Sequence, residues 1–290
     1  MYSAIAANKR KTWFILIGFL ALVWGLAYLF GQYYGGDYAF TGVALIVAAV
    51  YALISYFAAD KMALALNGGR VITKKDEPRL WRTVENLAIT EGLPMPRVCL
   101  IDDPAPNAFA TGRNPERALV GATTGLLAVM DDHELEGVMA HELGHVKNYD
   151  IRVSLIAAAL VMAIGLLADM FWRMQWFGSN RERSGGLLAV FALVAAILTP
   201  LIANLLRLAI SRKREYLADA TGALSTRYPE GLASALSKIA AHGSQLKKQH
   251  TSTAHLFIAN PLKGGLAGLF STHPPVEERV RRLREMGGKL

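Results

Sequence analysis

Cysteine is almost absent from the sequence, and its scarcity limits how the chain can bind a metal. Cys99 is the single cysteine among 290 residues. One thiol excludes both an internal disulfide and a metal site built from several cysteines. Any metal that this chain binds must therefore be held by histidine and carboxylate side chains.

Charge is also scarce, and the uncharged residues gather in long runs. Charged residues make up 19% of the chain and apolar residues 53%, and residues 12–36, 38–59 and 184–206 contain no charged side chain. Each run is long enough for the ~20 residues that a helix needs to cross the hydrocarbon core of a bilayer. A fourth run, 153–177, is weaker because Asp169 interrupts it. The runs predict a membrane protein with two to four transmembrane helices, the alternative for the last two runs being buried core helices.

Basic residues outnumber acidic ones, and many of them lie beside the apolar runs. In a soluble protein the net charge of +8 would suggest a nucleic-acid partner. Basic residues at the ends of apolar runs are typical of membrane anchoring, so we expect a lipid bilayer and no nucleic acid. Because Lys and Arg are enriched in cytoplasmic loops, their distribution places the N-terminus and residues 60–152 in the cytoplasm. Arg181 and Arg183 do not fit this orientation, because they lie in a loop that should face outward. The residues that set this orientation are Lys9, Arg10, Lys11, Lys61, Arg70, Lys74, Lys75, Arg207, Arg212, Lys213 and Arg214.

The apolar runs divide the chain into four parts. We expect an N-terminal transmembrane hairpin at 1–59, a cytoplasmic part at 60–152, a second hydrophobic hairpin at 153–210 and a second cytoplasmic part at 211–290. The cytoplasmic parts carry patterns of both helix and strand. The expected fold is therefore mostly α with a small β-sheet.

Several elements of the cytoplasmic parts can be placed from their apolar periodicity and terminal residues. Asp131 is a good N-cap with Glu134 three residues later, which predicts a helix that runs to about Tyr149. Further helices are expected to begin at Pro229 and near Pro275. We also expect a helix at 77–91 that Gly92 and Pro94 end, a strand at 97–101 and a β-hairpin of strands 107–111 and 118–121.

The decisive pattern is the sequence His141-Glu142-Leu143-Gly144-His145 within one of these helices. Residues four apart lie on one helical face, so both imidazoles can reach one metal ion. Zinc bound there would activate a water molecule and polarise a peptide carbonyl. Glu142 can take a proton from that water and pass it to the leaving amine. The pattern predicts a zinc metalloendopeptidase with one zinc ion per chain, the alternative being two surface histidines.

Two histidines and a water leave one protein ligand of the zinc missing. A histidine six residues after His145 is excluded because that position is Ile151. The best carboxylate is Glu215, four residues before Asp219, so that one of the pair can bind zinc while the other orients a ligand histidine. Taken alone, the pair would be better explained as the exposed charged start of a helix. If the two intervening runs both cross the membrane, or neither does, all three ligands can meet on one side.

These residues resemble the HtpX family of membrane zinc metallopeptidases, relatives of the CAAX-type prenyl-protein endopeptidases. The resemblance implies a gluzincin-like core with the HExxH pattern, zinc, and Glu215 as the third ligand. It also implies membrane-protein or unfolded-polypeptide substrates and quality control, as part of a stress response, in a bacterial inner membrane. The matching stretches are 107–112, the HELGH helix, Arg214-Glu215-Tyr216-x-Ala218-Asp219, and His273-Pro274-Pro275 followed by Arg279.

The resemblance assigns two further roles. Residues 107–111 are similar to the family's edge strand, along which a substrate adds as another strand, and the alternative is an ordinary hairpin strand. His273 and Arg279 resemble residues that face the cleft and could donate to the developing oxyanion, whereas His273 could instead cap the helix at Pro275. Asp150 is interpreted as structural. The expected substrate-binding residues are Asn107, Ala108, Phe109, Ala110 and Thr111.

Two other functions compete with the endopeptidase. An enzyme restricted to one lipidated or C-terminal motif would need a closed intramembrane chamber, and therefore more than four membrane helices. A non-enzymatic membrane adaptor with a relic zinc site would be favoured by loss of Glu142, but Glu142 is present.

Overall fold

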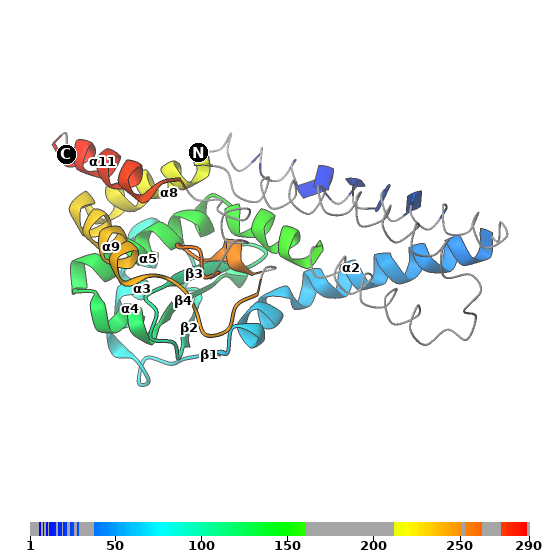
Figure 1. The fold of residues 1–290 in the computed structure, drawn as a ribbon, viewed down its shortest axis with the longest axis horizontal. Helices are drawn as coiled ribbons and strands as arrows, with labels where there is room; N and C mark the ends of the chain where they lie inside the picture. Colours follow the sequence, from blue (N-terminus) through cyan, green and yellow to red (C-terminus); the bar gives the residue numbers. More distant parts are fainter. Residues whose placement is uncertain are drawn as a thin grey trace.

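The computed structural model describes residues 38–160, 212–250, 253–262 and 274–288, with scattered positions between 6 and 28. The described part is mostly helical with one small sheet, which confirms the expected mixture of elements (Figure 1). In chain order the elements are α2 (Tyr38–Leu66), β1 (Gly69–Val71), α3 (Pro78–Glu91), β2 (Arg97–Ile101), β3 (Ala108–Thr111), η1 (Pro115–Arg117), β4 (Leu119–Thr123), α4 (Thr124–Val129), α5 (Asp132–Lys147), α8 (Arg212–Thr226), α9 (Pro229–His242), η3 (Ala254–Leu256) and α11 (Val276–Gly287).

The sheet has four strands in the order β1-β2-β4-β3. β3 and β4 form the predicted antiparallel hairpin, with Ala108 opposite Ala122. β2 runs parallel to β4, with Arg97 opposite Leu119, and β1 is antiparallel to β2. β3 therefore lies at an edge of this sheet, and it also contacts α5.

Helix α5 is the central helix and contacts α3, α8, α9, β3 and β4. Its first turn has the predicted capping box, in which Asp131 accepts from the backbone N–H of Glu134 and the Glu134 carboxylate accepts from the N–H of Asp131. Such a cap stabilises a helix by about 1 kcal/mol. A Cβ atom at Gly137 would lie 2.6 Å from the backbone nitrogen of Leu232, so α9 approaches α5 closely at this glycine. The HELGH sequence consequently lies in the interior of the molecule.

The ends of the predicted elements agree closely with the structure. β2 covers the predicted strand 97–101, and α9 begins at Pro229. α3 ends at Gly92, whose φ of 65° is a left-handed conformation that glycine adopts without strain. α5 ends earlier than predicted, at Lys147, because Tyr149 has a φ of 59° that cannot continue a helix.

No helix in the part of the chain that the structure describes is both long and apolar enough to count as a candidate membrane span. The predicted run 184–206 lies outside the described residues, as does 161–177 of the run before it. The first run, 12–36, is described only at scattered positions. The membrane spans and the division into four parts therefore stay predictions.

Candidate metal centre

Helices α5 and α8 cross closely enough to bring their polar side chains together in the interior. A Cβ atom at Gly222 in α8 would lie 3.0 Å from the backbone nitrogen of His141 in α5. A Cβ atom at Gly144 would lie 3.4 Å from Ala218, at ordinary contact distance. The small residues at this crossing place Glu215 and Asp219 beside the HELGH sequence.

His141, His145 and Glu215 form the group that can hold a metal ion, with their ligand atoms all within 4.8 Å of one another. The two Nε2 atoms of the histidines are 3.2 Å apart. Glu215 Oε1 lies 3.5 Å from His145 Nε2, and Glu215 Oε2 lies 3.9 Å from His141 Nε2. Tetrahedral zinc with ligands at about 2.0–2.1 Å separates neighbouring ligand atoms by about 3.3–3.4 Å. The three side chains therefore fit a zinc ion in both chemistry and spacing.

The second nitrogen of each histidine ring faces a carboxylate. His141 Nδ1 is 2.9 Å from Asp219 Oδ1, and His145 Nδ1 is 3.2 Å from Asp150 Oδ2. When both rings are neutral and their Nδ1 atoms donate to these carboxylates, both Nε2 atoms are lone-pair acceptors and cannot bond to each other. Two converging lone pairs beside a carboxylate form a site for a cation.

Asp150, interpreted from the sequence as a structural residue, is thus also part of the site, because it contacts His145. It follows the end of α5, and the left-handed Tyr149 turns the chain so that the Asp150 carboxylate reaches back to His145. No periodic pattern marks such a residue, because its direction depends on a turn conformation that Tyr149 rarely adopts.

Arg279 in α11 is buried against Asp219. Its Nε and Nη2 atoms donate to the two Asp219 oxygens at 2.9 and 2.7 Å, and Nη2 lies 3.4 Å from His141 Nδ1. Two of the guanidinium nitrogens are thus engaged by a carboxylate, which favours a role in holding His141 over the expected donation to an oxyanion. His273, the other candidate for that donation, lies outside the described residues.

Burial and charge shift the pKa values of these groups in different directions. Burial lowers the pKa of His141 to about 4, against the opposing effect of the hydrogen bond that His141 donates to Asp219. Burial would also lower the pKa of His145, but the Asp150 hydrogen bond and the Glu215 carboxylate outweigh it and raise that pKa to about 9. Burial would raise the pKa of Asp219, but the adjacent Arg279 charge and hydrogen bonds hold it at about 2. Asp219 is therefore an ionised acceptor, and a metal ion that binds His145 displaces a proton.

Glu142 lies next to the three ligand side chains and is 1% exposed. Its Oε1 atom is buried without a hydrogen-bond partner among the described residues. Burial raises the pKa of Glu142 to about 8. A buried carboxyl group with a free oxygen at a cavity wall is suited to exchange a proton with a small molecule in that cavity.

Residues 254–258 lie along the outer edge of β3, where the substrate strand is expected. The Ile258 N–H donates to the Ala108 carbonyl at 2.9 Å, and Phe257 pairs with Phe109 as an antiparallel bridge. The cavity beside Glu142, which this segment helps to line, has a volume of about 30 Å³, room for about one or two water molecules and not for a peptide. A peptide can pair along this edge only after residues 254–258 have moved.

The expected substrate-binding residues are all buried in or beside β3. Asn107 has a structural role here, because its Nδ2 donates to the carbonyls of Ser244 and Ala259, and its Oδ1 accepts from the Ala259 N–H. Ala110 lines the cavity beside Glu142. Contact with a substrate therefore stays a prediction for 107–111.

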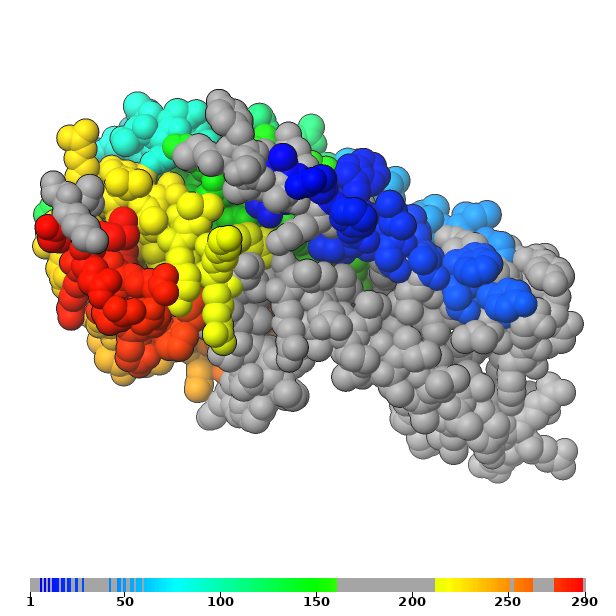
Figure 2. Space-filling view, turned by 90° about the horizontal axis from the view of Figure 1, so that it is seen from above, coloured from blue at the N-terminus to red at the C-terminus, as the bar shows by residue number. Residues whose placement is uncertain are grey.

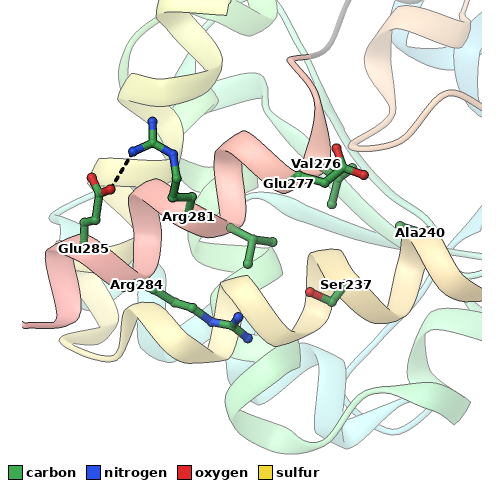
Figure 3. Close-up of a pocket in the computed structure, with 8 residues that line it drawn as sticks. Ser237, Ala240, Val276, Glu277, Arg281, Arg284 and Glu285 are labelled. Atoms are coloured by element: carbon green, nitrogen blue, oxygen red, sulfur yellow. Dashed lines mark hydrogen bonds and ion pairs between the residues drawn. The ribbon is translucent and has the colours of Figure 1, made fainter.

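A larger hollow of about 720 Å³ lies on the surface between α9 and α11 (Figure 3). The side chain of Ser237 donates to a carbonyl of its own helix, and Arg281 and Arg284 pair with glutamates. The residues that line the hollow include no histidine or cysteine. The candidate chemistry of the described residues is confined to the HELGH site.

Comparison with known proteins gives consistent matches. Residues 74–287 match the family model described as Peptidase family M48. The chain is 54% identical to the Protease HtpX homolog of Tropheryma whipplei (strain Twist), with all of both chains covered. It is 46% identical to the Protease HtpX homolog of Dictyoglomus thermophilum over 99% of this chain and 95% of the relative.

A solved structure shows the same fold at lower similarity. The chain matches the crystal structure of S. mikatae Ste24p with a TM-score of 0.51 and 20% identity, covering 98% of this chain and 67% of that one. At this identity the likeness concerns the fold alone.

Proposed function

The chain belongs to peptidase family M48 and is a metallopeptidase, and we propose that it is a zinc-dependent membrane endopeptidase with one zinc ion held by His141, His145 and Glu215. Its substrates are proposed to be membrane proteins or unfolded polypeptides, cleaved at the cytoplasmic face of a bacterial inner membrane in the course of quality control. The observation that carries the proposal is the convergence of three ligand atoms beside a buried, unpartnered Glu142 oxygen.

Different side chains of the site have different roles in the proposed hydrolysis. His141, His145 and Glu215 would hold the zinc ion, which would supply Lewis-acid chemistry for the attacking water and the scissile carbonyl. Glu142 accepts a proton from the attacking water and delivers it to the leaving amine, a contribution of roughly 10²–10⁴ in rate. Asp219 and Asp150 hold the two ligand imidazoles in the tautomer that leaves Nε2 free.

The proposed membrane location is supported by the surface of α2. This helix runs away from the body that contains the metal centre (Figure 1). Ile46, Leu53, Ile54 and Phe57 are more than half exposed along it. Large apolar side chains in a row on an exposed helix mark a surface that contacts lipid or another protein.

The decisive experiment separates the proton-transfer group from the ligands. We expect purified Glu142→Gln to keep its zinc by elemental analysis, because Glu142 is not a ligand, and to lose casein cleavage by at least about 10²-fold, because an amide cannot accept the proton. Glu215→Ala should lose both zinc and activity. A chelator should abolish wild-type cleavage, and added zinc should restore it.

Two outcomes contradict the proposal. Wild-type cleavage rates in Glu142→Gln would remove Glu142 from the chemistry. Full zinc content in Glu215→Ala would remove Glu215 from the ligands.

A further inference from the structure

Asn8 connects the N-terminal segment to the candidate metal centre. Its Nδ2 atom donates to the backbone carbonyl of Asn148 at 2.9 Å and to Oδ1 of Asp150 at 2.8 Å. These three residues are buried, with at most 5% of each exposed. The other Asp150 oxygen, Oδ2, faces His145 Nδ1 at 3.2 Å. A continuous path of hydrogen bonds therefore runs from Asn8 through Asp150 to His145. Figure 2 shows the N-terminal residues, in dark blue, against the body of the molecule.

The two donor positions of the Asn8 amide fix the direction of the Asp150 carboxylate. One N–H is anchored on the backbone where α5 ends, and the other holds Oδ1, so the carboxylate is tied to the end of the helix that carries His145. The guanidinium of Arg214 is also near Oδ1, but its Nη1 atom is more distant than the Asn8 amide, at 3.6 Å. Without Asn8 the carboxylate would be free to turn toward Arg214 and away from His145.

We propose that Asn8 is a positioning residue of the metal centre, which orients His145 through Asp150 and so makes the N-terminal segment a determinant of zinc affinity. The proposal rests on the proposed zinc site. It assigns to a residue before the first apolar run an effect on a ligand 137 positions later in the sequence.

The test is the zinc dissociation constant of the purified full-length protein, measured by competition with a chromogenic chelator. Loss of an outer partner of a metal-bound histidine typically weakens affinity 10–100-fold, so we expect about tenfold weaker zinc binding in Asn8→Ala. Thr12→Val is the matched control, because Thr12 is also buried in the N-terminal segment but its hydroxyl donates to the Asn8 backbone carbonyl and, among the described residues, not to Asp150. Its zinc affinity should equal that of the wild type.

A double-mutant cycle separates positioning from general destabilisation. If Asn8 acts through Asp150, Asn8→Ala should cause no further loss of zinc affinity in an Asp150→Ala background. An equal loss in both backgrounds, or unchanged affinity in Asn8→Ala, would overturn the proposal. Should Asn8→Ala fail to fold, Asn8→Asp replaces it, because it keeps the volume and substitutes an acceptor for the donor that faces Asp150.

The zinc measurement does not depend on proteolysis, so the two proposals can fail separately. Wild-type protein that binds one zinc ion while Asn8→Ala binds it equally tightly contradicts only the role of Asn8. Wild-type protein that binds no zinc contradicts the proposed function.

Discussion

Each of the two histidines proposed as ligands is held through its Nδ1 atom, which faces away from the proposed metal position. Asp219 holds His141 and is itself neutralised by the buried guanidinium of Arg279. Asp150 holds His145 and is bonded to an amide. A buried carboxylate without partners is strongly unfavourable. Replacing Arg279, the partner of Asp219, or Asn8, the partner of Asp150, should therefore disturb the hydrogen bonds to the histidine rings.

Arg279→Met tests whether the arginine holds a ligand or donates to the oxyanion. The change leaves Asp219 as a buried charge without its main partner, and we expect zinc affinity to fall about 10–100-fold through the loss of support for His141. The rate at saturating zinc should change much less. Chelator competition and casein cleavage on the same preparation measure the two quantities.

The matched control for Arg279 lies on the same helix. Arg281 is exposed and pairs with Glu278 and Glu285 at the surface, where such pairs contribute about 0–1 kcal/mol. Arg281→Met should therefore leave zinc affinity unchanged. Unchanged zinc affinity in Arg279→Met, together with a large loss of rate, would instead support donation to the oxyanion.

At the scale of elements, the glycines of α5 differ in how closely a neighbouring helix approaches them. A Cβ at Gly137 would meet the α9 backbone at 2.6 Å, and Gly137→Ala should destabilise the protein by about 1–3 kcal/mol through overpacking. A Cβ at Gly144 would lie at an ordinary 3.4 Å, so Gly144→Ala should keep its zinc and gain up to about 1 kcal/mol of helix stability. Thermal unfolding of the two purified variants checks the difference in sign.

The segment 254–258 should compete with substrate for the edge of β3. Ile258→Pro and Ile258→Ala both lose the buried side chain, but only proline also removes the N–H that donates to the Ala108 carbonyl. That bond contributes about 0.5–1.5 kcal/mol, so kcat/KM for casein should be roughly 2- to 12-fold higher in Ile258→Pro than in Ile258→Ala. Equal values would mean that this pairing does not obstruct the substrate.

The sequence was most informative where a local rule decides the structure. The capping pair Asp131 and Glu134 marked the start of α5, and Gly92 marked the end of α3. The parallel pairing of β2 with β4 and the three-residue strand β1 were not foreseen, because they depend on contacts between distant residues.

The site was predictable to the extent that its chemistry lies at helical spacing. The i, i+4 spacing of the histidines, and of Glu215 and Asp219, placed four residues that the fold brings together. Asp150 and Asn8 act through a turn and a long-range contact, for which no periodic signal exists. Nothing in the composition of residues 254–258 indicates that they cover the edge of β3.

At the scale of the whole molecule, the metal centre joins parts of the chain that lie on either side of a long apolar region. His141 and His145 precede residues 153–206, and Glu215 follows them. A metal–ligand bond cannot cross a bilayer, so the proposed zinc site requires the HELGH helix and α8 to share one side of the membrane. The distribution of Lys and Arg predicts that this side is the cytoplasm.

This arrangement predicts the labelling pattern of single cysteines in intact cells. Cys99 is fully buried and gives little background. Cysteines at Lys74, Asp132 and Tyr228, whose side chains are exposed, should resist a membrane-impermeant thiol reagent in cells and react after detergent solubilisation. A cysteine at Gly35, at the C-terminal end of the first apolar run, should react in cells.

A cysteine at Ser184 should react if the later apolar runs span the membrane and stay protected if they form a shallow cytoplasmic hairpin. Either result leaves the zinc site intact, because the chain returns to the same side in both. Asn148 is unsuitable as a probe, since its burial would protect it in any orientation. Labelling of Tyr228 together with protection of Asp132 would place Glu215 across the bilayer from the histidines and exclude the three-ligand site.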